Sequence, residues 1–256
     1  MRSLSTLATV ISGAKYQWLP AYALASPWRL QAICHSLRMT SSFLLRRSQF
    51  LSAHGLSRGI LFGPHQVHSR AILTVDKQRP EDLAGIEADG MITVNPSAVL
   101  TILVADCLPI FLFDHTTGAF GLVHSGWKGT GIVIEAVLAM AERFGTRPSE
   151  LAVTIGPGIG ACCYRVPEDR AVRFAAEFGP LAAVRDTEGN PSLDLRKANV
   201  ALLNEAGVTE IAVVDECTCC SPALGSFRRQ GPNEITLMLA YIGRQDSSAV
   251  ETLTGQ

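Results

Sequence analysis

The chain has 256 residues, a formal net charge of −1 at pH 7 and 47% hydrophobic residues, which suits one substantial core in a single domain. Its most apolar run, Ala98 to Phe113, is broken by Asp106 and Pro109 and is shorter than the roughly 20 residues that span a bilayer, so no membrane span is predicted. Seven cysteines, including two adjacent pairs, form no disulfide framework in a chain of this size and favour a reducing cytoplasm.

The N-terminal part has an unusual charge. Residues 1–75 contain no Asp or Glu and carry +8, while the remainder carries −9. Such a start is typical of an organellar transit peptide, and a wrongly assigned start or an out-of-frame segment gives the same composition. Outside residues 1–45, basic and aromatic residues do not interleave, so no nucleic-acid footprint is predicted there.

Seven apolar, β-rich runs bounded by Gly, Pro, Asp or Asn predict strands. In chain order they cover residues 71–75, 99–105, 110–113, 120–124, 151–155, 211–214 and 235–241. Helical spacing of apolar residues predicts helices over 131–144 and 195–206, and a further helix is expected over 168–178. Asp194 is a good N-cap, and Gly145 and Gly207 stand where a helix ends in a left-handed residue.

The order of these elements predicts the fold class. Strands alternate with helices in the second half, whereas residues 99–124 contain consecutive strands joined by short turns, so a purely parallel sheet is not expected. We predict an α/β fold, a layered mixed β-sheet sandwich with flanking helices.

Three short motifs carry most of the functional information: Gln66-Val67-His68, Ala105-Asp106-Cys107 and His124-Ser125-Gly126-Trp127. Each lies near a predicted strand end, and together they offer two imidazoles and one thiolate. This set leaves the fourth position of a tetrahedral zinc ion open, as in catalytic sites. On the residues alone, a packing cysteine and ordinary histidines are the commoner interpretation.

From about Arg46 to Arg244 the sequence resembles the YfiH family, also called the laccase-domain or polyphenol oxidase family. The family motifs occur here in order: Gln66-Val67-His68-Ser69, Ala88-Asp89-Gly90, Thr101 to Pro109, His124 to Gly129, Ile155 to Gly160, Cys162-Cys163-Tyr164, Asp215, Cys217 and Ser226-Phe227-Arg228-Arg229. Residues 1–45 lack the family's Phe-x-x-Arg-x-Gly-Gly-Val-Ser segment, which favours a wrongly assigned start. The resemblance therefore divides the chain into an atypical N-terminal segment (1–45), a family-like catalytic domain (46–246) and a C-terminal tail (247–256). Lys128 replaces the usual Arg, so a bidentate anion contact becomes a point-charge contact.

The resemblance implies a layered α/β fold similar to that of bacterial toxins with a Cys-His deamidase site. It also implies a zinc-dependent purine nucleoside phosphorylase that acts on adenosine, inosine and methylthioadenosine and has adenosine deaminase activity. The expected partners are a small-molecule nucleoside and phosphate, with no nucleic acid and no membrane. A cytoplasmic monomer or homodimer is expected.

The resemblance assigns roles to individual residues. The metal, Zn²⁺ or alternatively Cu²⁺, would be bound by His68, Cys107 and His124. The catalytic residues would be Cys107, His124 and Asp106, and the substrate would be bound by Lys128, Arg228 and Asp89. Asp106 and Asp89 can orient ligating imidazoles or act as a general base, and capping of a strand end is an equally open role.

Two further features have a structural and a functional interpretation. Trp127 offers a flat face for a purine, although a core tryptophan is commoner. Cys217, Cys219 and Cys220 suggest a second metal site, but the adjacent pair Cys162-Cys163 is cramped and no zinc-finger spacing is present, so buried thiols are expected.

Three other functions stay open on the sequence. Cys107 and His124 can form the nucleophile and base of a metal-free cysteine hydrolase or amidase. A copper-binding polyphenol oxidase is the second, although a multicopper site needs many histidines and the chain has six. A non-catalytic metal-binding or scaffold protein is the third.

Overall fold

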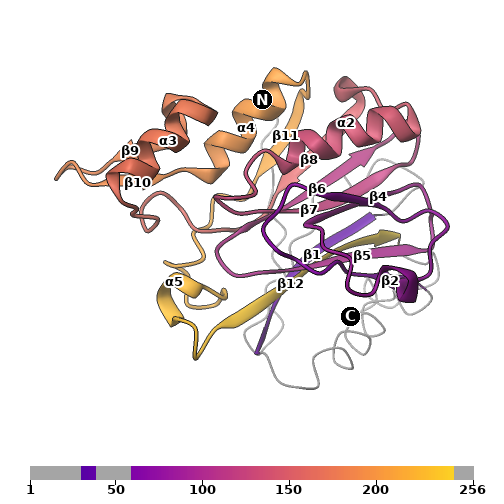
Figure 1. Cartoon of the computed structure of the whole chain (residues 1–256), viewed down its shortest axis with the longest axis horizontal. Coiled ribbons are helices and arrows are strands. Elements are labelled where there is room, and N and C mark those ends of the chain that lie inside the picture. Colours follow the sequence, from indigo (N-terminus) through magenta and orange to yellow (C-terminus); the bar gives the residue numbers. More distant parts are fainter. Residues whose placement is uncertain (1–29, 39–58, 245–256) are drawn as a thin grey trace, which may run out of the picture.

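The computed structural model of the chain describes residues 30–38 and 59–244. Most of the predicted N-terminal segment and the predicted C-terminal tail lie outside these ranges. The described residues form three layers: helices, a six-stranded sheet and a four-stranded sheet (Figure 1). In the described part of the chain, no helix is long and apolar enough to cross a membrane.

The six-stranded sheet forms the middle layer. Its strand order is β11 (Glu210–Val213), β8 (Leu151–Ile155), β6 (Leu108–Asp114), β7 (Phe120–Ser125), β4 (Gly90–Thr93) and β3 (Ile72–Thr74). The two outer pairs, β11 with β8 and β3 with β4, are parallel, and the inner pairs are antiparallel. The sheet is therefore mixed, as predicted.

The four-stranded sheet forms an outer layer. Its order is β1 (Leu30–Arg38), β12 (Thr236–Arg244), β5 (Ala98–Val104) and β2 (Ile60–Phe62). Strand β1 comes from the segment 1–45, and its backbone pairs antiparallel with β12 from Leu30 opposite Arg244 to Arg38 opposite Thr236. A separate antiparallel pair is formed by β9 (Ala183–Arg185) and β10 (Pro191–Leu193).

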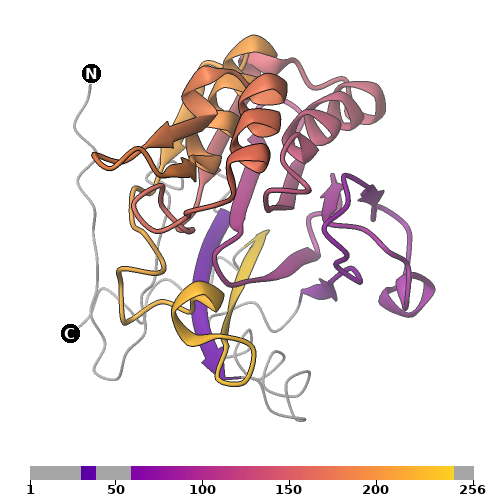
Figure 2. The same ribbon diagram turned by 60° about the vertical axis from the view of Figure 1, so that its left-hand side comes forward.

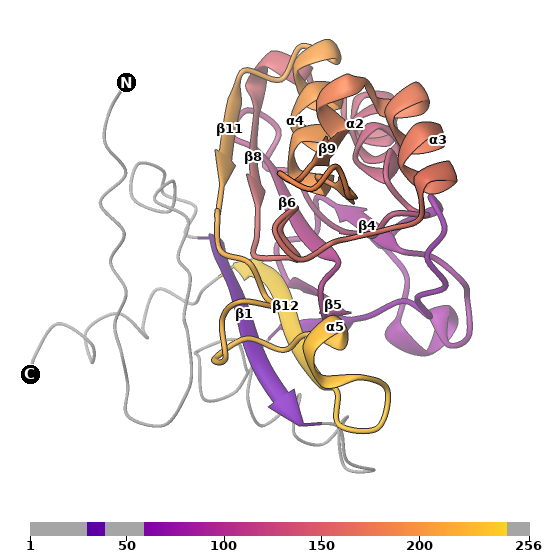
Figure 3. The same cartoon turned by 90° about the vertical axis from the view of Figure 1, so that its left-hand side faces the viewer.

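Three long helices cover the face of the middle sheet that points away from the four-stranded sheet (Figure 3). They are α2 (Ile132–Phe144), α3 (Glu168–Phe178) and α4 (Leu195–Glu205). The short helix α5 (Phe227–Gln230) lies apart from them, beside the start of β12 (Figure 2). Single turns of 3₁₀ helix occur at Pro80–Leu83, Pro148–Glu150 and Pro180–Ala182.

Alternate residues of the middle sheet face two cores. Ile110 and Leu112 of β6 pack under the helices with Val133, whereas Phe111 packs between the sheets with Leu100. The period of two follows from strand geometry, and burial on both faces explains why β6 is an almost continuous apolar run. Each such fully buried side chain contributes about 1.5–3 kcal/mol to folding.

All the predicted strands and helices are present, with their ends shifted by at most a few residues. The Asp194 side chain accepts a hydrogen bond from the Lys197 backbone, and Gly145 and Gly207 have φ angles of 71° and 87°, as their places at helix ends required. Strand β4 was not predicted, because its four buried residues follow a turn too closely for an alternating pattern to develop.

The chain changes sheets at two places that matter for the site. Strands β5 and β6 are consecutive in sequence but lie in different sheets, so residues 105–107 carry the chain from one sheet to the other. The loop between β2 and β3 makes a second crossing in the same direction. Both crossings carry residues of the predicted metal site.

Candidate active site

The structure brings His68, Cys107 and His124 together. His68 lies on the β2–β3 crossing, Cys107 on the β5–β6 crossing, and His124 near the end of β7, opposite Pro109 of β6. Their nitrogen and sulfur atoms lie within 4.8 Å of one another, in an arrangement that can hold a metal ion. The two imidazole rings meet edge to face, with centroids 4.8 Å apart. Residues distant in sequence therefore form one group at the seam between the two sheets.

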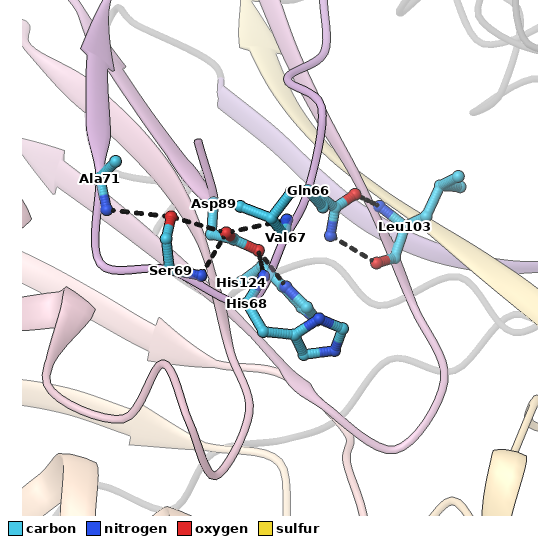
Figure 4. Close-up of polar contacts among 8 residues, drawn as sticks. All are labelled: Gln66, Val67, His68, Ser69, Ala71, Asp89, Leu103 and His124. Atoms are coloured by element: carbon cyan, nitrogen blue, oxygen red, sulfur yellow. Dashed lines mark hydrogen bonds and ion pairs between the residues drawn. The ribbon is translucent and has the colours of Figure 1, made fainter. Parts of the chain in front are cut away.

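Asp89 fixes the backbone of His68 and the ring of His124 (Figure 4). Its fully buried carboxylate accepts hydrogen bonds from the backbone amides of Val67, His68 and Ser69 at 3.1, 3.0 and 2.6 Å. It also lies 2.8 Å from Nδ1 of His124, which leaves Nε2 of that ring free to face the group. Asp89 is not among the residues that line the adjoining cleft. Its position suits the orientation of imidazoles, not contact with a substrate.

The site favours an ionised Asp89. Burial by itself would raise the pKa of this carboxyl, but hydrogen bonds from His124 and Ser69 hold the pKa well below its ordinary value. The charge on Asp89 in turn stabilises a positive charge on the His124 ring.

Cys107 and His124 shift each other's pKa. Burial opposes ionisation of both groups, but hydrogen bonds and charge attraction outweigh it. His124 and His68 lower the pKa of the Cys107 thiol to about 7, and Asp89 and Cys107 raise the pKa of His124 to about 9. In the absence of a metal ion, the pair therefore favours a thiolate beside an imidazolium near neutral pH.

Gln66 ties the His68 loop to the four-stranded sheet. Its side-chain amide donates to the Leu103 carbonyl at 2.9 Å and accepts from the Leu103 amide at 2.8 Å (Figure 4). His68 itself has a φ of 62° and Asp106 has a φ of 79°, both in the left-handed region that non-glycine residues seldom occupy. Hydrogen bonds around His68 and Asp106 stabilise these two unfavourable backbone conformations.

Gly126 is required for the approach of the chain to the thiolate. A Cβ atom at this position would lie 2.7 Å from Sγ of Cys107 and 3.4 Å from the His68 ring. Only glycine therefore allows the segment after β7 to run this close to Cys107 and His68.

A cleft of about 740 Å³ opens onto the three residues. Aromatic and cationic side chains from four different regions of the chain line its walls. They include Trp127, Lys128, Tyr164, Arg170, Phe227 and Arg228. Such walls suit a ligand with a flat ring and a negative charge.

The predicted anion-binding residues lie in this cleft. The Arg228 guanidinium donates to the carbonyls of Cys163 and Arg165, each at 3.1 Å, and lies 5.4 Å from the Tyr164 ring centroid. Nζ of Lys128 lies 5.7 Å from the Trp127 ring centroid. Arg229 has a different role, because its guanidinium donates to the carbonyls of the loop before α5. Of the two adjacent arginines, Arg228 is therefore the one that lines the cleft.

Asp106 lines the cleft, but its carboxylate holds helix α5. It accepts from Oγ1 of Thr218 at 2.6 Å and from the Arg228 backbone amide at 2.7 Å. Neither bond involves an imidazole, so Asp106 positions Arg228 while Asp89 positions the histidines.

Arg170 is a residue of the cleft that the sequence did not suggest. It comes from α3, and its guanidinium carbon lies 4.4 Å from the centroid of the Trp127 ring. The Trp127 ring is half-buried at the cleft wall. No motif surrounds Arg170, and only the packing of α3 against the segment after β7 could have identified it.

Four other cysteines also converge, contrary to the expectation of buried thiols. Cys162, Cys163, Cys217 and Cys220 have sulfur atoms within 4.8 Å of one another. Cys162 and Cys220 are exposed and the other two are half-buried. The expectation of buried thiols was therefore wrong for Cys162 and Cys220. The convergence itself could not be predicted, because the two segments meet only in the tertiary structure.

The family model described as multi-copper polyphenol oxidoreductase laccase matches residues 41–245. The purine nucleoside phosphorylase YlmD of Geobacillus stearothermophilus is 37% identical over 166 residues, which cover 62% of this chain and 60% of that protein. The purine nucleoside phosphorylase of Deinococcus radiodurans is 35% identical over 199 residues, covering 77% and 75%. Mouse purine nucleoside phosphorylase LACC1 is 32% identical over 163 residues, covering 60% and 36%.

The fold is similar to that of solved structures. The crystal structure of YlmD from Geobacillus stearothermophilus has a TM-score of 0.80 at 26% identity and covers 94% of this chain and 100% of that one. The YfiH protein of Bacillus licheniformis has a TM-score of 0.74 at 25% identity, covering 86% and 97%. These matches confirm the predicted layered α/β fold. The aligned sequences span only part of these relatives, about a third of LACC1 and three-fifths of YlmD.

Proposed function

The chain belongs to the family described as multi-copper polyphenol oxidoreductase laccase, and from this membership we propose that it is a zinc-dependent purine nucleoside phosphorylase. Relatives that are 30–37% identical carry the name purine nucleoside phosphorylase. The observation that carries the proposal is the meeting of a His-Cys-His group with Lys128 and Arg228 in one cleft. The proposed substrates are adenosine, inosine and methylthioadenosine, and the proposed compartment is the cytoplasm.

In the proposed reaction, an oxygen of inorganic phosphate attacks C1′ of the ribose. The bond between C1′ and N9 breaks, its electron pair leaves with the purine, and ribose 1-phosphate forms. The departing purine then takes up a proton. Catalysis of this type depends on holding an anion and a sugar carbon in line and on stabilising developing charge.

Lys128 and Arg228 are the proposed phosphate-binding residues. Both line the cleft, and both are exposed enough to meet an anion from solvent. Arg228 is held by Asp106 through its backbone amide and by two carbonyls through its guanidinium. This leaves its position fixed before the anion binds, which reduces the entropy lost on binding.

The aromatic residues are the proposed binding surface for the purine. Trp127, Tyr164 and Phe227 line the same cleft as the cations. A purine is flat and apolar on its faces, and stacking on aromatic rings contributes about 0.5–1.5 kcal/mol beyond the area buried. The aromatic side chains thus suit the purine of the nucleoside, and the cationic side chains beside them suit the phosphate.

The three ligand residues fit a zinc ion. One thiolate and two imidazoles are ligands that zinc prefers, and Asp89 directs Nε2 of His124 toward the group by engaging Nδ1. A bound zinc ion supplies a Lewis acid at the floor of the cleft. We also propose adenosine deaminase activity at this site, in which the oxygen of water replaces the amino group at purine C6 and ammonia leaves.

A second candidate is a metal-free cysteine hydrolase or amidase. It is favoured by the contact between Cys107 and His124, since a nucleophilic thiolate needs an adjacent base that is itself oriented by a third group. Asp89 supplies that third group at 2.8 Å from the ring. The two candidates differ in whether a chelator abolishes activity.

The experiment is an assay of purified protein, with its metal content measured, for phosphate-dependent release of base from adenosine and inosine. We expect release that requires phosphate, stops after removal of the metal and returns with added Zn²⁺. Cys107→Ala should abolish it, while Cys219→Ala, a cysteine outside the group, should not. Activity that survives chelation would favour the hydrolase, and absence of base release from the zinc-loaded protein would refute the phosphorylase.

A further inference from the structure

The second cysteine group lies at one edge of the middle sheet. Strands β8 and β11 are parallel neighbours, so the segments that follow them leave the sheet at the same edge. Cys162 and Cys163 follow β8, and Cys217 and Cys220 follow β11. A bridge between Gly158 and Cys217, together with a hydrogen bond of 3.0 Å from the Thr218 amide to the Gly158 carbonyl, joins the two segments. The four sulfur atoms consequently meet.

We propose that Cys162, Cys163, Cys217 and Cys220 bind a structural zinc ion, at a site separate from the His68–Cys107–His124 group. With zinc–sulfur bonds of about 2.3 Å, the sulfur atoms of a regular tetrahedron lie about 3.8 Å apart. Here the distance from Cys220 Sγ is 3.7 Å to Cys162 Sγ and 3.4 Å to Cys163 Sγ, and all four atoms lie within 4.8 Å. An iron–sulfur cluster would spread the four sulfurs more widely, because several iron atoms would lie between them.

The coordination number indicates a structural role. Four cysteine ligands close the coordination of zinc, whereas a catalytic site keeps one position open. The first group has three protein ligands and adjoins the cleft, and the second has four and is not part of the cleft lining. The two groups therefore differ in the way that catalytic and structural zinc sites differ.

The surroundings compensate the charge of such a site. Four thiolates around Zn²⁺ carry a net charge of 2−, and their protons pass to solvent when the ion binds. Guanidinium groups of Arg196, Arg228 and Arg229 donate to the carbonyls of Glu216, Cys163 and Cys219, at 2.6, 3.1 and 2.9 Å. The Gly160 amide also donates to Cys217 Sγ at 3.1 Å. Three guanidinium groups thus bind the backbone of the segments that carry the ligands, and one ligand sulfur accepts from an amide that stabilises a thiolate.

The proposed ion would join two loops that shape the cleft. The Cys163 carbonyl is one of the acceptors that hold Arg228, and the neighbouring Tyr164 lines the cleft. The inference does not depend on the proposed function, because it concerns metal content and can be measured without any substrate.

The test counts zinc in full-length protein purified without chelators under anaerobic, reducing conditions. We expect two zinc ions per chain. Cys107→Ala should retain one, and the double variant Cys162→Ser with Cys220→Ser should also retain one. Cys219→Ser should retain two, because this cysteine is adjacent in sequence but lies outside the group. Cobalt substitution provides a second measurement, since five cobalt–thiolate bonds in the wild type should give a much stronger charge-transfer band than the one bond of the first site alone.

One zinc ion per wild-type chain, together with a cobalt spectrum of a single thiolate, would overturn the proposal. So would two zinc ions that both persist in the double variant. A disulfide between Cys220 and either Cys162 or Cys163 in the protein kept under reducing conditions would also refute it. The wild-type count and spectrum decide the matter even if the double variant does not fold.

Discussion

His124 and Asp89 are joined by a hydrogen bond of 2.8 Å between Nδ1 and Oδ1, and the same carboxylate holds the backbone of the His68 loop. One buried anion therefore fixes the ring of His124 and the backbone that carries His68, two of the three proposed metal ligands. Because Nδ1 of His124 is engaged, its other nitrogen is the one presented to the group. This relationship makes Asp89 the residue on which the geometry of the site most depends.

Asp89→Asn should weaken metal binding about 10–100-fold, as expected when a carboxylate partner of a ligating histidine is lost. Asparagine also replaces one acceptor oxygen with an NH2 group, which cannot accept from the backbone amides of Val67, His68 and Ser69. The free energy of unfolding should therefore fall by roughly 1–3 kcal/mol. Chelator competition and thermal unfolding measure the two effects. Asp82→Asn, at an exposed ion pair with Arg79, is the control. An unchanged metal affinity would contradict the role given to Asp89.

Gly126→Ala should reduce metal affinity at least tenfold while the fold is retained. The new methyl group would lie 2.7 Å from Cys107 Sγ, so the thiolate must move. Gly118→Ala is the matched control: nothing lies within 4 Å of its added methyl group, but its φ of +75° imposes a backbone cost. The control should lose stability and keep its metal. Equal metal binding by both variants would show that the approach at Gly126 is not needed.

Lys128→Arg should lower the KM for phosphate several-fold, because a guanidinium binds an anion with two parallel hydrogen bonds. The KM for the nucleoside should change much less. Lys77→Arg repeats the substitution at an exposed position away from the cleft and should leave both constants unchanged. A higher KM for phosphate would mean that Lys128 acts through its size or its contact with Trp127.

Alkylation of Cys107 in the metal-free protein should follow a titration with its midpoint at about pH 7. The thiolate is the reactive form, so the rate should rise with pH and level off above this value. A lowered thiol pKa also means that its contribution to stability is lost as the pH falls through about 7. His124→Gln should move the midpoint toward the ordinary range of a thiol. Peptide mapping by mass spectrometry separates Cys107 from the other cysteines, and an unmoved midpoint would exclude His124 as the cause.

Local patterns were enough to predict most of the elements. The apolar runs of β5 to β8 and the helical spacing in α2 and α4 depend on neighbouring residues, so sequence alone places them. The assignment of β5 and β6 to different sheets does not depend on local residues. It follows from packing between the sheets, where Phe111 and Leu100 face the same core.

The candidate site was predictable only through its motifs. His68, Cys107 and His124 stood out by ligand type and by resemblance, but the direction of each neighbouring carboxylate did not. Asp89 turns to the histidines and Asp106 turns to Thr218 and Arg228, a difference that depends on contacts made after folding.

The group of Cys162, Cys163, Cys217 and Cys220 could not be predicted from the sequence either. Cys162 and Cys220 meet because β8 and β11 are parallel neighbours, and strand adjacency cannot be read from spacing along the chain. Arg170 likewise enters the cleft from a helix whose sequence has no functional motif.

The position of His68 and Cys107 on the two crossings between sheets has a mechanical consequence. An ion bound by His68, Cys107 and His124 would cross-link the two connections between the sheets and the end of β7. Its binding free energy would therefore add to the stability of the folded sandwich. Sheet packing affects metal binding in turn, because a substitution that shifts one sheet relative to the other also moves the ligands apart. Substitutions in the core between the sheets, far from the cleft, should thus change the affinity for the ion without altering any of its ligands.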